Sequence, residues 1–527
     1  MALQSSLKHL PFELSPTFYL SFLCFIITFF FVFKLKRSRG NSNYNLPPSP
    51  PKLPFIGNLH QLGTLPHRSF QSLSHKYGPL MLLHLGQTPT LIVSSAQIAK
   101  EIVKSHDVVF SNRPRTTAAR ILLYECTDVG FIPYGEEWRQ KRKICVLELL
   151  SLKRVRSFQF IREEEASDLV TKIRESCENN IINGSPALIN LTPMLIAATS
   201  NVVSRCVLGQ KSEKADGKSS FGDVARKMMI QLAAFSFGNF FPSLGWMDAV
   251  SGLIPKLKAT SVELDTFFDE IIAQHKMAKT NDDESEKKDF VDILLQLQDD
   301  DMLEFKLTHQ DLKGMIADMF VGGGDTTSTA LEWTFAELLK NPIAMKKVQE
   351  EVRRVVGHKS KIDENDVRQM KYLECVVKES LRLHPPLPLL VPRETRSIAK
   401  LGEYDIPPQT SVFLNAWAIQ RDPELWEKPE EFIPERFENS EVDFKGQDFQ
   451  LVPFGFGRRG CPGMSFGVAS VEYFLAVLLF WFDWKLPSGT TTTSSQDIDM
   501  SEIYGLTVNK KVPILVEPIP YSFGPQL

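Results

Sequence analysis

A glycine-rich loop with one cysteine and two arginines lies near the carboxyl end and runs directly into an apolar stretch. The loop reads FGFGRRGCPG over residues 454–463, and the apolar residues 464–481 that follow predict a helix. Cys461 is therefore expected just before a helix, where backbone N–H groups, Arg458 and Arg459 favour a thiolate over a thiol. The glycines on both sides let the backbone approach a bulky planar group closely. This loop limits the chain to folds that present a thiolate to such a group.

The other cysteines give no competing site. Six of the seven are widely spread along the chain and none forms a close pair, which fits a reducing compartment and excludes clustered zinc or iron–sulfur ligands. A single thiolate of this kind is a ligand for haem iron. The weaker alternative is a dinucleotide fingerprint, because Gly455, Gly457 and Gly460 match GxGxxG. That motif needs a strand before it and an acidic residue about twenty positions later. Here Pro453 interrupts any preceding strand, and the region around Phe480, where the acidic residue would lie, is apolar.

A second constraint is one long helix predicted from Thr308 to Lys340. It opens with a Thr-x-x-Asp capping pattern, stops at Asn341-Pro342, and at 1.5 Å per residue extends roughly 50 Å. Its middle nevertheless reads GGGDTT over residues 322–327, and three glycines cost about 2–3 kcal/mol relative to alanine. We interpret the bare backbone as a surface for a flat ligand, with Asp325 and Thr326 placed to transfer protons. Close packing of two helices is the alternative.

The amino-terminal residues predict a membrane anchor. Residues 18–33 carry no charge and are rich in Phe, Ile and Leu, and four basic residues follow within six positions: Lys34, Lys36, Arg37 and Arg39. By the positive-inside rule the rest of the protein is then cytosolic. A cleaved secretory signal is the alternative, but the charges follow the apolar run and no small-residue cleavage site is present. We expect an anchor with its basic stop at 1–40, a proline-rich spacer at 41–57 and a catalytic domain at 58–527.

Composition bounds the remaining possibilities. The 527 residues carry a net charge of −3, so no basic field for a nucleic-acid partner exists. Residues 79–95 predict two strands about a GQTP turn, and most later segments have helical periodicity. The chain is therefore expected to be mainly α, with a small β-rich region and no repeat.

The cysteine loop resembles the haem-binding loop of the cytochrome P450 family, whose pattern FxxGxRxCxG it matches at every defined position. Other landmarks of that family occur in order along nearly the whole chain: Trp138-x-x-x-Arg142, Gly322 to Thr327, Glu379-x-x-Arg382 and Pro434 to Phe437. The combination is similar to the plant A-type microsomal members. The resemblance implies the cytochrome P450 fold, preceded by a single transmembrane helix.

The resemblance also implies a site. Haem iron would be bound by Cys461, the cofactor would be held by Trp138, Arg142, Arg393, Arg459 and Phe454, and Asp325 and Thr326 would act in catalysis. Glu379 falls on an apolar helix face, where a carboxylate needs partners, and the family pattern supplies Arg382 and Arg436 as a buried network. A solvated pair is the alternative. Position alone suggests substrate-pocket residues at 118–123, 235–241, 387–391 and 503–506 and at Met319.

The implied function is a monooxygenase that inserts one atom of O₂ into a hydrophobic small molecule. The substrate would be a plant specialised metabolite such as a terpenoid, phenylpropanoid, alkaloid or aldoxime, and NADPH–cytochrome P450 reductase would supply electrons. Lys141, Lys143 and Arg458 would contribute to a basic docking surface for that partner. The implied location is the endoplasmic reticulum membrane, single-pass, with a cytosolic catalytic domain. A haem-thiolate isomerase or dehydratase that needs no reductase, and a non-catalytic haem-binding protein, are the alternatives.

Overall fold

The computed structural model describes residues 19–29, 44–182, 188–212, 221–279, 288–299, 305–487 and 498–521. The chain divides into two compact units, residues 1–45 and 46–527. In the first unit the described residues are 19–29 and 44–45, and residues Tyr19–Phe29 form an apolar helix. The expected basic stop at Lys34, Lys36, Arg37 and Arg39 lies outside the described residues. The short apolar helix agrees with the expected anchor only weakly.

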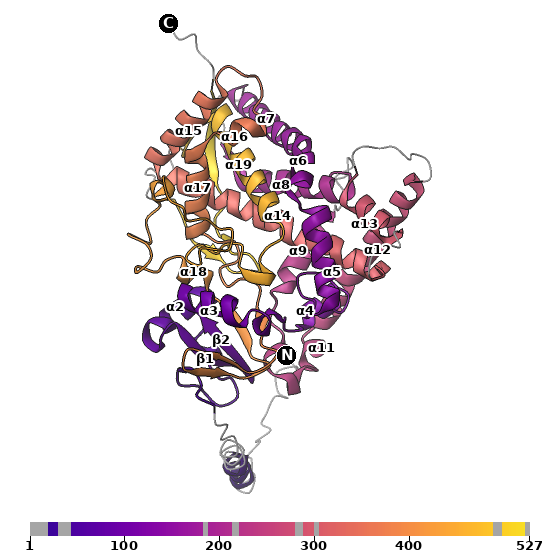
Figure 1. Ribbon diagram of the computed structural model, residues 1–527, viewed down its shortest axis with the longest axis vertical. Coiled ribbons are helices and arrows are strands. Elements are labelled where there is room, and N and C mark those ends of the chain that lie inside the picture. The colour runs from indigo at the N-terminus through magenta and orange to yellow at the C-terminus, as the bar shows by residue number, and fades with distance from the viewer. Residues whose placement is uncertain are drawn as a thin grey trace, which may run out of the picture. The chain divides into compact units, whose positions relative to one another are not determined.

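The second unit is mainly helical, as the sequence predicts (Figure 1). Its α-helices are α2 (Pro66–Tyr77), α3 (Ala96–His106), α4 (Thr117–Leu122), α5 (Glu136–Ile144), α6 (Leu152–Ser157), α7 (Gln159–Ile182), α8 (Leu191–Leu208), α9 (Phe221–Leu232), α10 (Phe237–Phe240), α11 (Met247–Val250), α12 (Leu253–Lys279), α13 (Phe290–Asp299), α14 (His309–Lys340), α15 (Pro342–Val356), α16 (Glu364–Val367), α17 (Lys371–Leu383), α18 (Ala416–Ile419) and α19 (Met464–Trp481). Short 3-10 or π turns are η1 (Leu59–Gln61), η2 (Val109–Ser111), η3 (Cys145–Leu149), η4 (Pro242–Leu244), η5 (Pro434–Phe437) and η6 (Gly457–Arg459).

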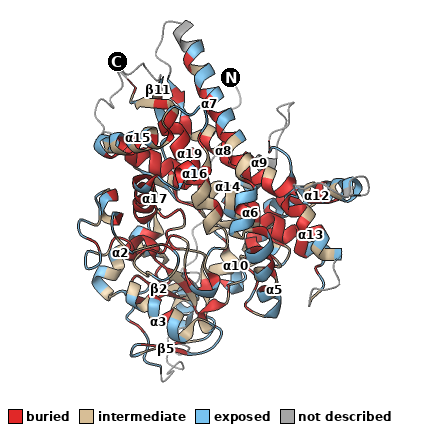
Figure 2. Ribbon diagram, turned by 45° about the horizontal axis from the view of Figure 1, so that its top comes forward, coloured by how far each residue is buried: buried red, intermediate tan, exposed pale blue. Residues whose placement is uncertain are grey.

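Helix α14 is the long helix that the sequence predicts. Thr308 and Asp311 form the expected capping box, in which each side chain accepts a hydrogen bond from the other residue's backbone N–H, and the helix ends at Asn341. It packs against α8, α17 and α19 in the largest apolar cluster of the unit. Figure 2 shows buried residues along α8 and α19, whereas the glycine-rich middle of α14 is less buried. The middle of α14 therefore borders internal space.

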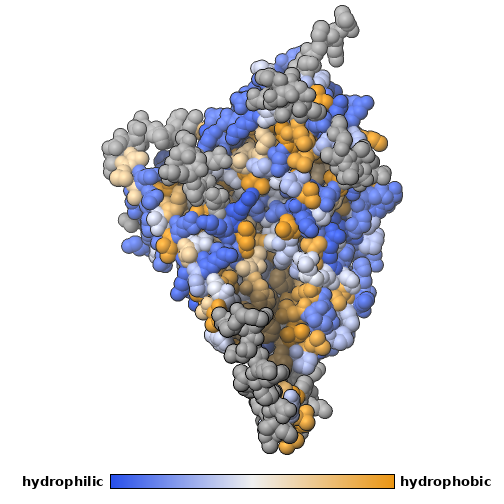
Figure 3. All heavy atoms as spheres, turned by 180° about the vertical axis from the view of Figure 1, so that it is seen from behind, coloured by the Kyte–Doolittle hydropathy of each residue, from blue (hydrophilic) through white to orange (hydrophobic). Residues whose placement is uncertain are grey.

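Two further helices, α8 and α19, are long and apolar enough by length and composition to cross a membrane. Both lie mostly inside the protein, and about 61% of each apolar window is buried. Their apolar residues are therefore explained by the core. The face in Figure 3 is largely hydrophilic and is hollowed where hydrophobic side chains gather.

The strands form small sheets. The expected pair, β1 (Leu80–Leu85) and β2 (Thr88–Val93), is antiparallel, and the four-stranded sheet has the order β1-β2-β7-β4. Strand β7 (Ser411–Leu414) runs parallel to β2, and β4 (Arg393–Glu394) pairs with β7. The remaining strands are β3 (Ile189–Asn190), β5 (Ala399–Leu401), β6 (Tyr404–Ile406), β8 (Phe482–Lys485), β9 (Glu502–Ile503), β10 (Asn509–Lys510) and β11 (Leu515–Pro520). The first sheet fixes Arg393 at the start of β4, opposite Val412 of β7.

The proline-rich segment forms no helix over its described residues from 44 onward. Its Pro48 carbonyl accepts a hydrogen bond from the Leu82 N–H of β1, at 2.9 Å. The Asn58 side chain links the segment to β1, because Nδ2 donates to the Pro50 carbonyl and Oδ1 accepts from the His84 N–H. The segment is thus tied to the sheet from Leu46 on, and the expected division at residue 58 stays a prediction.

The expected carboxylate–arginine network is confirmed. Glu379 is fully buried and receives hydrogen bonds from Arg382 at 2.7 and 2.8 Å and from Arg436 Nε at 2.9 Å. The Ile433 N–H donates to the same carboxylate at 2.9 Å. Arg382 Nη1 also donates to the Gln420 and Pro429 carbonyls, at 2.8 and 2.7 Å. The network therefore joins α17 to the segment that leads into the cysteine loop.

Candidate active site

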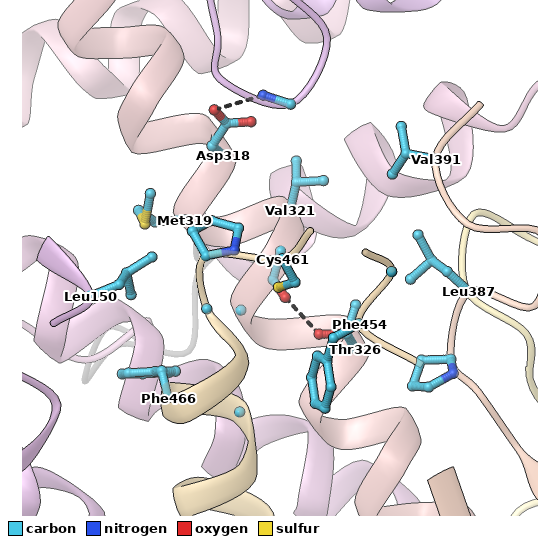
Figure 4. A pocket seen from close by; sticks show the side chains of 18 of the residues that line it. Leu150, Asp318, Met319, Val321, Thr326, Leu387, Val391, Phe454, Cys461 and Phe466 are labelled. Atoms are coloured by element: carbon cyan, nitrogen blue, oxygen red, sulfur yellow. Dashed lines mark hydrogen bonds between the residues drawn. The ribbon is translucent and has the colours of Figure 1, made fainter. Parts of the chain in front are cut away.

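A cavity of about 290 Å³ lies in the second unit between α14, α5 and the loop that precedes α19 (Figure 4). Its wall is mostly apolar and includes Phe131, Leu150, Val203, Val207, Met319, Val321, Ala330, Leu387, Leu390, Val391, Phe454, Phe466 and Leu506. The polar groups on the wall are concentrated in four arginines, Cys461, Asp318, Thr326 and Thr327. Apolar walls with a few convergent polar groups are typical of a cofactor or substrate site.

Cys461 lies on this wall. Its backbone N–H donates to the Phe454 carbonyl at 2.8 Å, which closes the loop on itself before α19 begins. Its side chain has exposed surface although it is deep in the protein, because that surface faces the cavity. The five other cysteines of the second unit are buried, and of these only Cys145 also lines the cavity. The sequence prediction selected the cysteine that faces the space.

The electrostatic surroundings of Cys461 differ in part from the sequence prediction. Burial raises the pKa of the Cys461 thiol, and a hydrogen bond from the Gly463 amide and the charge of Arg142 partly oppose this rise. Arg458 instead pairs with Asp107 at 3.2 Å, and Arg459 donates to three backbone carbonyls. The prediction that these two arginines favour the thiolate is therefore wrong. Both hold the loop, and the cation that lowers the pKa of the Cys461 thiol is Arg142 on α5.

Two glycines of the loop have backbone conformations that a side chain would strain. Gly455 and Gly457 have φ values of +68° and +64°. A Cβ on Gly457 would lie 2.7 Å from Oδ1 of Asp107, the residue that accepts a hydrogen bond from the Arg458 N–H and forms an ion pair with the Arg458 guanidinium. Phe454 lines the cavity and packs edge-on against Phe444, with ring centroids 5.2 Å apart. The glycines let the loop turn so that Phe454 and Cys461 both face inward.

Four arginines surround the cavity: the expected Arg142, Arg393 and Arg459, and Arg113, which the sequence reasoning missed. Arg142 donates to the Gly460 carbonyl at 2.5 Å, and Arg393 to the Phe456 carbonyl at 2.7 Å. Arg113 donates to the Gly130 and Val391 carbonyls, at 3.0 and 2.6 Å. Nothing in the sequence of the loop that carries Arg113 marks it as a site residue.

The positive charge of this cluster is balanced only in part by the nearby carboxylates of Asp107 and Asp128. Burial, and then the neighbouring arginines, lower the pKa of Arg113, and the same two causes lower the pKa of Arg459 to about 9. Burial lowers the pKa of Arg393 to about 10; Asp107 opposes this from 3.8 Å, and Arg393 Nη1 has no hydrogen-bond partner among the described residues. Buried cations in this state call for an anionic ligand. A planar group with acidic substituents fits the cluster.

Trp138 also lies where the sequence predicts, on the cavity wall in α5. The Arg459 guanidinium lies over its ring, 4.5 Å from the centroid. The indole therefore holds one of the cavity's cations in place. By contrast, Lys141 on the same helix is fully buried and binds Glu137 and Asp311 at 2.5 and 2.7 Å, so its expected place on an exposed docking surface is wrong.

The glycines of α14 serve both of the purposes that the sequence left open. Gly322 lines the cavity, and a Cβ there would meet nothing within 4 Å. A Cβ on Gly323 would lie 3.0 Å from Cγ2 of Val203 on α8. Gly322 therefore leaves the helix bare toward the cavity, and Gly323 allows the close approach of α8.

The structure separates Thr326 from Asp325. Thr326 lines the cavity, and its hydroxyl donates to the Gly322 carbonyl at 2.5 Å (Figure 4). Asp325 is not on the cavity wall; its carboxylate accepts a hydrogen bond from the Thr507 hydroxyl. Burial raises the pKa of Asp325, which the Thr507 hydrogen bond and the charge of Arg226 oppose. Only one of the two expected catalytic side chains faces the space.

An acid that the sequence reasoning missed does line the cavity. Asp318 accepts a hydrogen bond from the Val129 N–H at 2.5 Å, which ties α14 to the loop before α5 (Figure 4). It lies beside Asp128, and burial followed by that second carboxyl raises the pKa of Asp318. Burial likewise raises the pKa of Asp128 to about 6. An acid within the apolar run MIADMFV was the available signal.

The expected substrate-pocket residues are confirmed in part. Met319, Leu506 and three residues of 387–391, namely Leu387, Leu390 and Val391, line the cavity. The residues of 118–123 and 235–241 do not, so those two predictions are wrong for this cavity. Residues 235–241 are held away from it, because Asn239 and Phe240 contact the Gly86–Thr88 turn of the first sheet.

Comparison with known proteins agrees with this geometry. The cytochrome P450 family model matches residues 47–513. A phenylacetaldehyde oxime monooxygenase of Prunus mume is 54% identical over 96% of this chain and 95% of its own length. Desmethylyatein synthase of Sinopodophyllum hexandrum is 51% identical over 95% of this chain and 98% of its own length. A solved zebra fish cytochrome P450 with abiraterone is 26% identical, with a TM-score of 0.72, over 87% of this chain and all of that chain.

The fold and the cavity thus define a haem-thiolate enzyme. The chain belongs to the cytochrome P450 family, in its plant A-type group. Its activity is that of a cytochrome P450 monooxygenase, and its cofactor is iron protoporphyrin IX with an axial cysteine thiolate. The isomerase or dehydratase alternative and the non-catalytic alternative are not favoured. The residues on the wall fit this cofactor, since they offer a cavity-facing thiol, excess buried cations and the bare helix surface at Gly322.

Proposed function

We propose that Cys461 binds the haem iron, and that Arg113, Arg142, Arg393 and Arg459 hold the two haem carboxylates. The observation that carries this assignment is the cluster of four arginines, three of them buried and Arg142 partly buried, whose hydrogen-bond partners are backbone carbonyls. Trp138 keeps Arg459 in place, and Phe454 provides an apolar contact beside the thiolate. Loss of a proton from the buried Cys461 thiol accompanies metal binding, as for other coordinating thiols.

Haem supplies the activation of O₂ and the insertion of one oxygen atom into the substrate. The chain supplies position and protons. Thr326 is the proposed catalytic side chain, because its hydroxyl reaches the cavity and can rotate from the Gly322 carbonyl to donate into it. Asp325 is the proposed acid behind it, since its raised pKa lets it hold a proton nearer to neutral pH than an ordinary aspartate.

We further propose that the protein is anchored in the endoplasmic reticulum membrane by the apolar amino-terminal segment, with its catalytic unit in the cytosol. The exposed helix Tyr19–Phe29 and the basic residues after it in the sequence support this. NADPH–cytochrome P450 reductase would supply the electrons. Lys143 and Arg458 have exposed side chains and remain candidates for the docking surface, whereas Lys141 is excluded by its burial.

The proposed substrate is a hydrophobic aromatic specialised metabolite. The wall is apolar, and aromatic side chains at Phe131, Phe290, Phe454 and Phe466 contribute to it. Two relatives more than half identical are named for an aldoxime and for desmethylyatein. Phenylacetaldehyde oxime is therefore the first compound to test, within a panel that includes lignans, alkaloids and terpenoids.

The test is turnover in microsomes that contain the full chain and the reductase. We expect products that require both NADPH and O₂ and carry one oxygen atom from ¹⁸O₂ before any later loss of water. Signal from microsomes without the chain is subtracted. A product that forms equally without NADPH would contradict the proposed monooxygenase cycle and favour an isomerase or dehydratase.

A further inference from the structure

The loop between β9 and β10 connects the cavity wall to the acid beside Thr326. Leu506 in this loop lines the cavity, and the next residue, Thr507, is buried and donates a hydrogen bond to Asp325 on α14. The two residues that meet are 182 positions apart in the chain. One side of the loop therefore faces the substrate space and the other holds a helix residue.

The bond between Thr507 and Asp325 belongs to a chain of hydrogen bonds. Asn509 Nδ2 donates to the Thr507 hydroxyl oxygen at 3.3 Å, and Asn509 Oδ1 accepts from the Thr329 hydroxyl, one turn further along α14. Asp325 and Thr329 on the helix are thereby linked through Thr507 on the loop and Asn509 at the start of β10. Because Thr507 and Thr329 are almost fully buried, water competes poorly for these bonds.

Two hydrogen bonds to the Val508 backbone also fix this loop. The Trp333 indole N–H donates to the Val508 carbonyl at 2.9 Å, and the Val508 N–H donates to the Pro386 carbonyl at 2.9 Å. Pro386 itself lines the cavity. The loop is thus held against α14 and against the part of the wall at Pro386, and the Thr507 hydroxyl is its link to the acid.

We propose that Thr507 is a positioning residue that sets Leu506 on the substrate wall and holds Asp325 beside Thr326. The proposal rests on the proposed function and deepens it. It names a residue on which two properties depend: the orientation of the substrate and the amount of product formed per NADPH consumed. A loop released from Asp325 shifts Leu506, so the substrate is held less well above the site of oxidation. The rate of reaction depends strongly on how closely the substrate is held to the reactive geometry, so a displacement of about 1 Å is enough to lower it.

The test compares Thr507→Val, which keeps the shape and removes the donor, with Thr507→Ser, which keeps the donor. Thr199→Val on α8 is the matched control, since that hydroxyl is buried and bonds only within its own helix, to the Leu195 and Ile196 carbonyls. The first measurement is the dissociation constant of 4-phenylimidazole and that of imidazole. Binding is monitored through the haem absorbance of the full-length protein. It requires haem but no turnover.

We expect Thr507→Val to weaken 4-phenylimidazole binding about tenfold, to leave imidazole binding within twofold, and to be rescued by serine. With phenylacetaldehyde oxime or another compound that the wild type oxidises, product per NADPH consumed should fall about threefold or more. The proposal would be overturned if Thr507→Val and the wild type had the same ratio of the 4-phenylimidazole and imidazole dissociation constants and also formed the same amount of product per NADPH consumed. If valine prevents folding, Asn509→Ala serves the same comparison, with a smaller expected effect of threefold on 4-phenylimidazole.

The two proposals fail in different ways. A wild type that binds both imidazoles but forms no NADPH-dependent product with any compound contradicts the proposed function and leaves the binding comparison intact. A wild type that turns over, with Thr507→Val unchanged in selectivity and coupling, contradicts the positioning role alone.

Discussion

Glu379 and Arg382, one turn apart on α17, are joined by two hydrogen bonds, from Nε to Oε2 at 2.7 Å and from Nη2 to Oε1 at 2.8 Å. Both side chains are fully buried. Arg436 adds a third bond to the carboxylate, and Arg382 extends the network to backbone carbonyls of the segment before the cysteine loop. The pair therefore connects a core helix to the part of the chain that presents Cys461.

Replacing Glu379 by glutamine should destabilise the protein by about 3 kcal/mol, because two arginines lose their buried counter-charge. The measurement is the shift of the urea unfolding transition of the detergent-solubilised protein. Glu350→Gln is the control, since its ion pair with Lys346 is exposed and spans 3.8 Å, and a change below about 0.5 kcal/mol is expected there. Equal effects of the two substitutions would contradict the role of the network.

Cys461→Ala should abolish the absorbance band of thiolate-ligated haem in the reduced, CO-bound protein. Cys145→Ala is a matched control, because Cys145 is the other cysteine on the cavity wall and is buried in the π turn after α5. We expect it to retain the band. A band that persists in Cys461→Ala would show that another residue binds the iron.

The two neighbouring glycines of α14 should respond oppositely to alanine. Gly322→Ala adds a methyl group where nothing lies within 4 Å and should stabilise the cofactor-free helix by about 0.5–1 kcal/mol. Gly323→Ala places it 3.0 Å from Val203 and should destabilise by about 1 kcal/mol. Adding Val203→Ala should relieve the contact. Urea titrations of the cofactor-free single and double variants test this, and a Gly323→Ala protein as stable as Gly322→Ala would contradict the packing role.

Arg113→Gln should accelerate the loss of haem from the protein, measured as transfer to an excess of apomyoglobin. The expected increase is about tenfold, because the variant lacks one of the buried cations proposed to hold the haem carboxylates. Arg139→Gln should leave the rate within twofold, because Arg139 on α5 is exposed and pairs with exposed Glu136. An unchanged rate in Arg113→Gln would remove Arg113 from the proposed set.

His275 should make stability fall as the pH rises from about 6.5 to 9. Burial alone would lower its pKa, but the Asp289 hydrogen bond at 2.9 Å and the charge of Asp289 outweigh burial and raise the pKa to about 9. The folded state binds this proton more tightly than the unfolded chain. The contribution of His275 to the free energy of unfolding is therefore complete below about pH 6.5 and is lost as the pH rises through about 9. After allowance for solvent screening it amounts to about 1–2 kcal/mol.

The measurement for His275 is the urea unfolding midpoint of the wild type and His275→Gln at several pH values from 6 to 9.5. The difference between the two proteins should shrink as the pH rises. His309→Gln is the control, because the His309–Asp269 pair is largely exposed. A difference that stays constant over this range would contradict the assignment.

The local sequence was sufficient for the elements whose signals lie within a short window. The capping box and length of α14, the strands at 80–93, and the cysteine loop with its glycines follow from periodicity, caps and turn residues. The resemblance to one family then placed Trp138, Arg142, Arg393 and the Glu379 network, all of which the structure brings to the expected neighbourhoods. These residues could be predicted because each belongs to a short motif, whose residue types and spacing can be read from the sequence.

Tertiary structure alone decided which side chains reach the cavity. Arg113 lines it without a distinctive local pattern, and Asp318 lines it from an apolar run whose sequence alone does not show which way the acid faces. Lys141 is buried against Asp311 from a helix remote in sequence, and Arg142, rather than Arg458 or Arg459, is the cation that affects the Cys461 thiol. Asp325 turns toward Thr507, and Thr326, one position later, faces the space. On a helix, adjacent residues point about 100° apart, so one position separates a cavity residue from a packing residue. Which of the two faces the cavity depends on contacts formed across the whole fold.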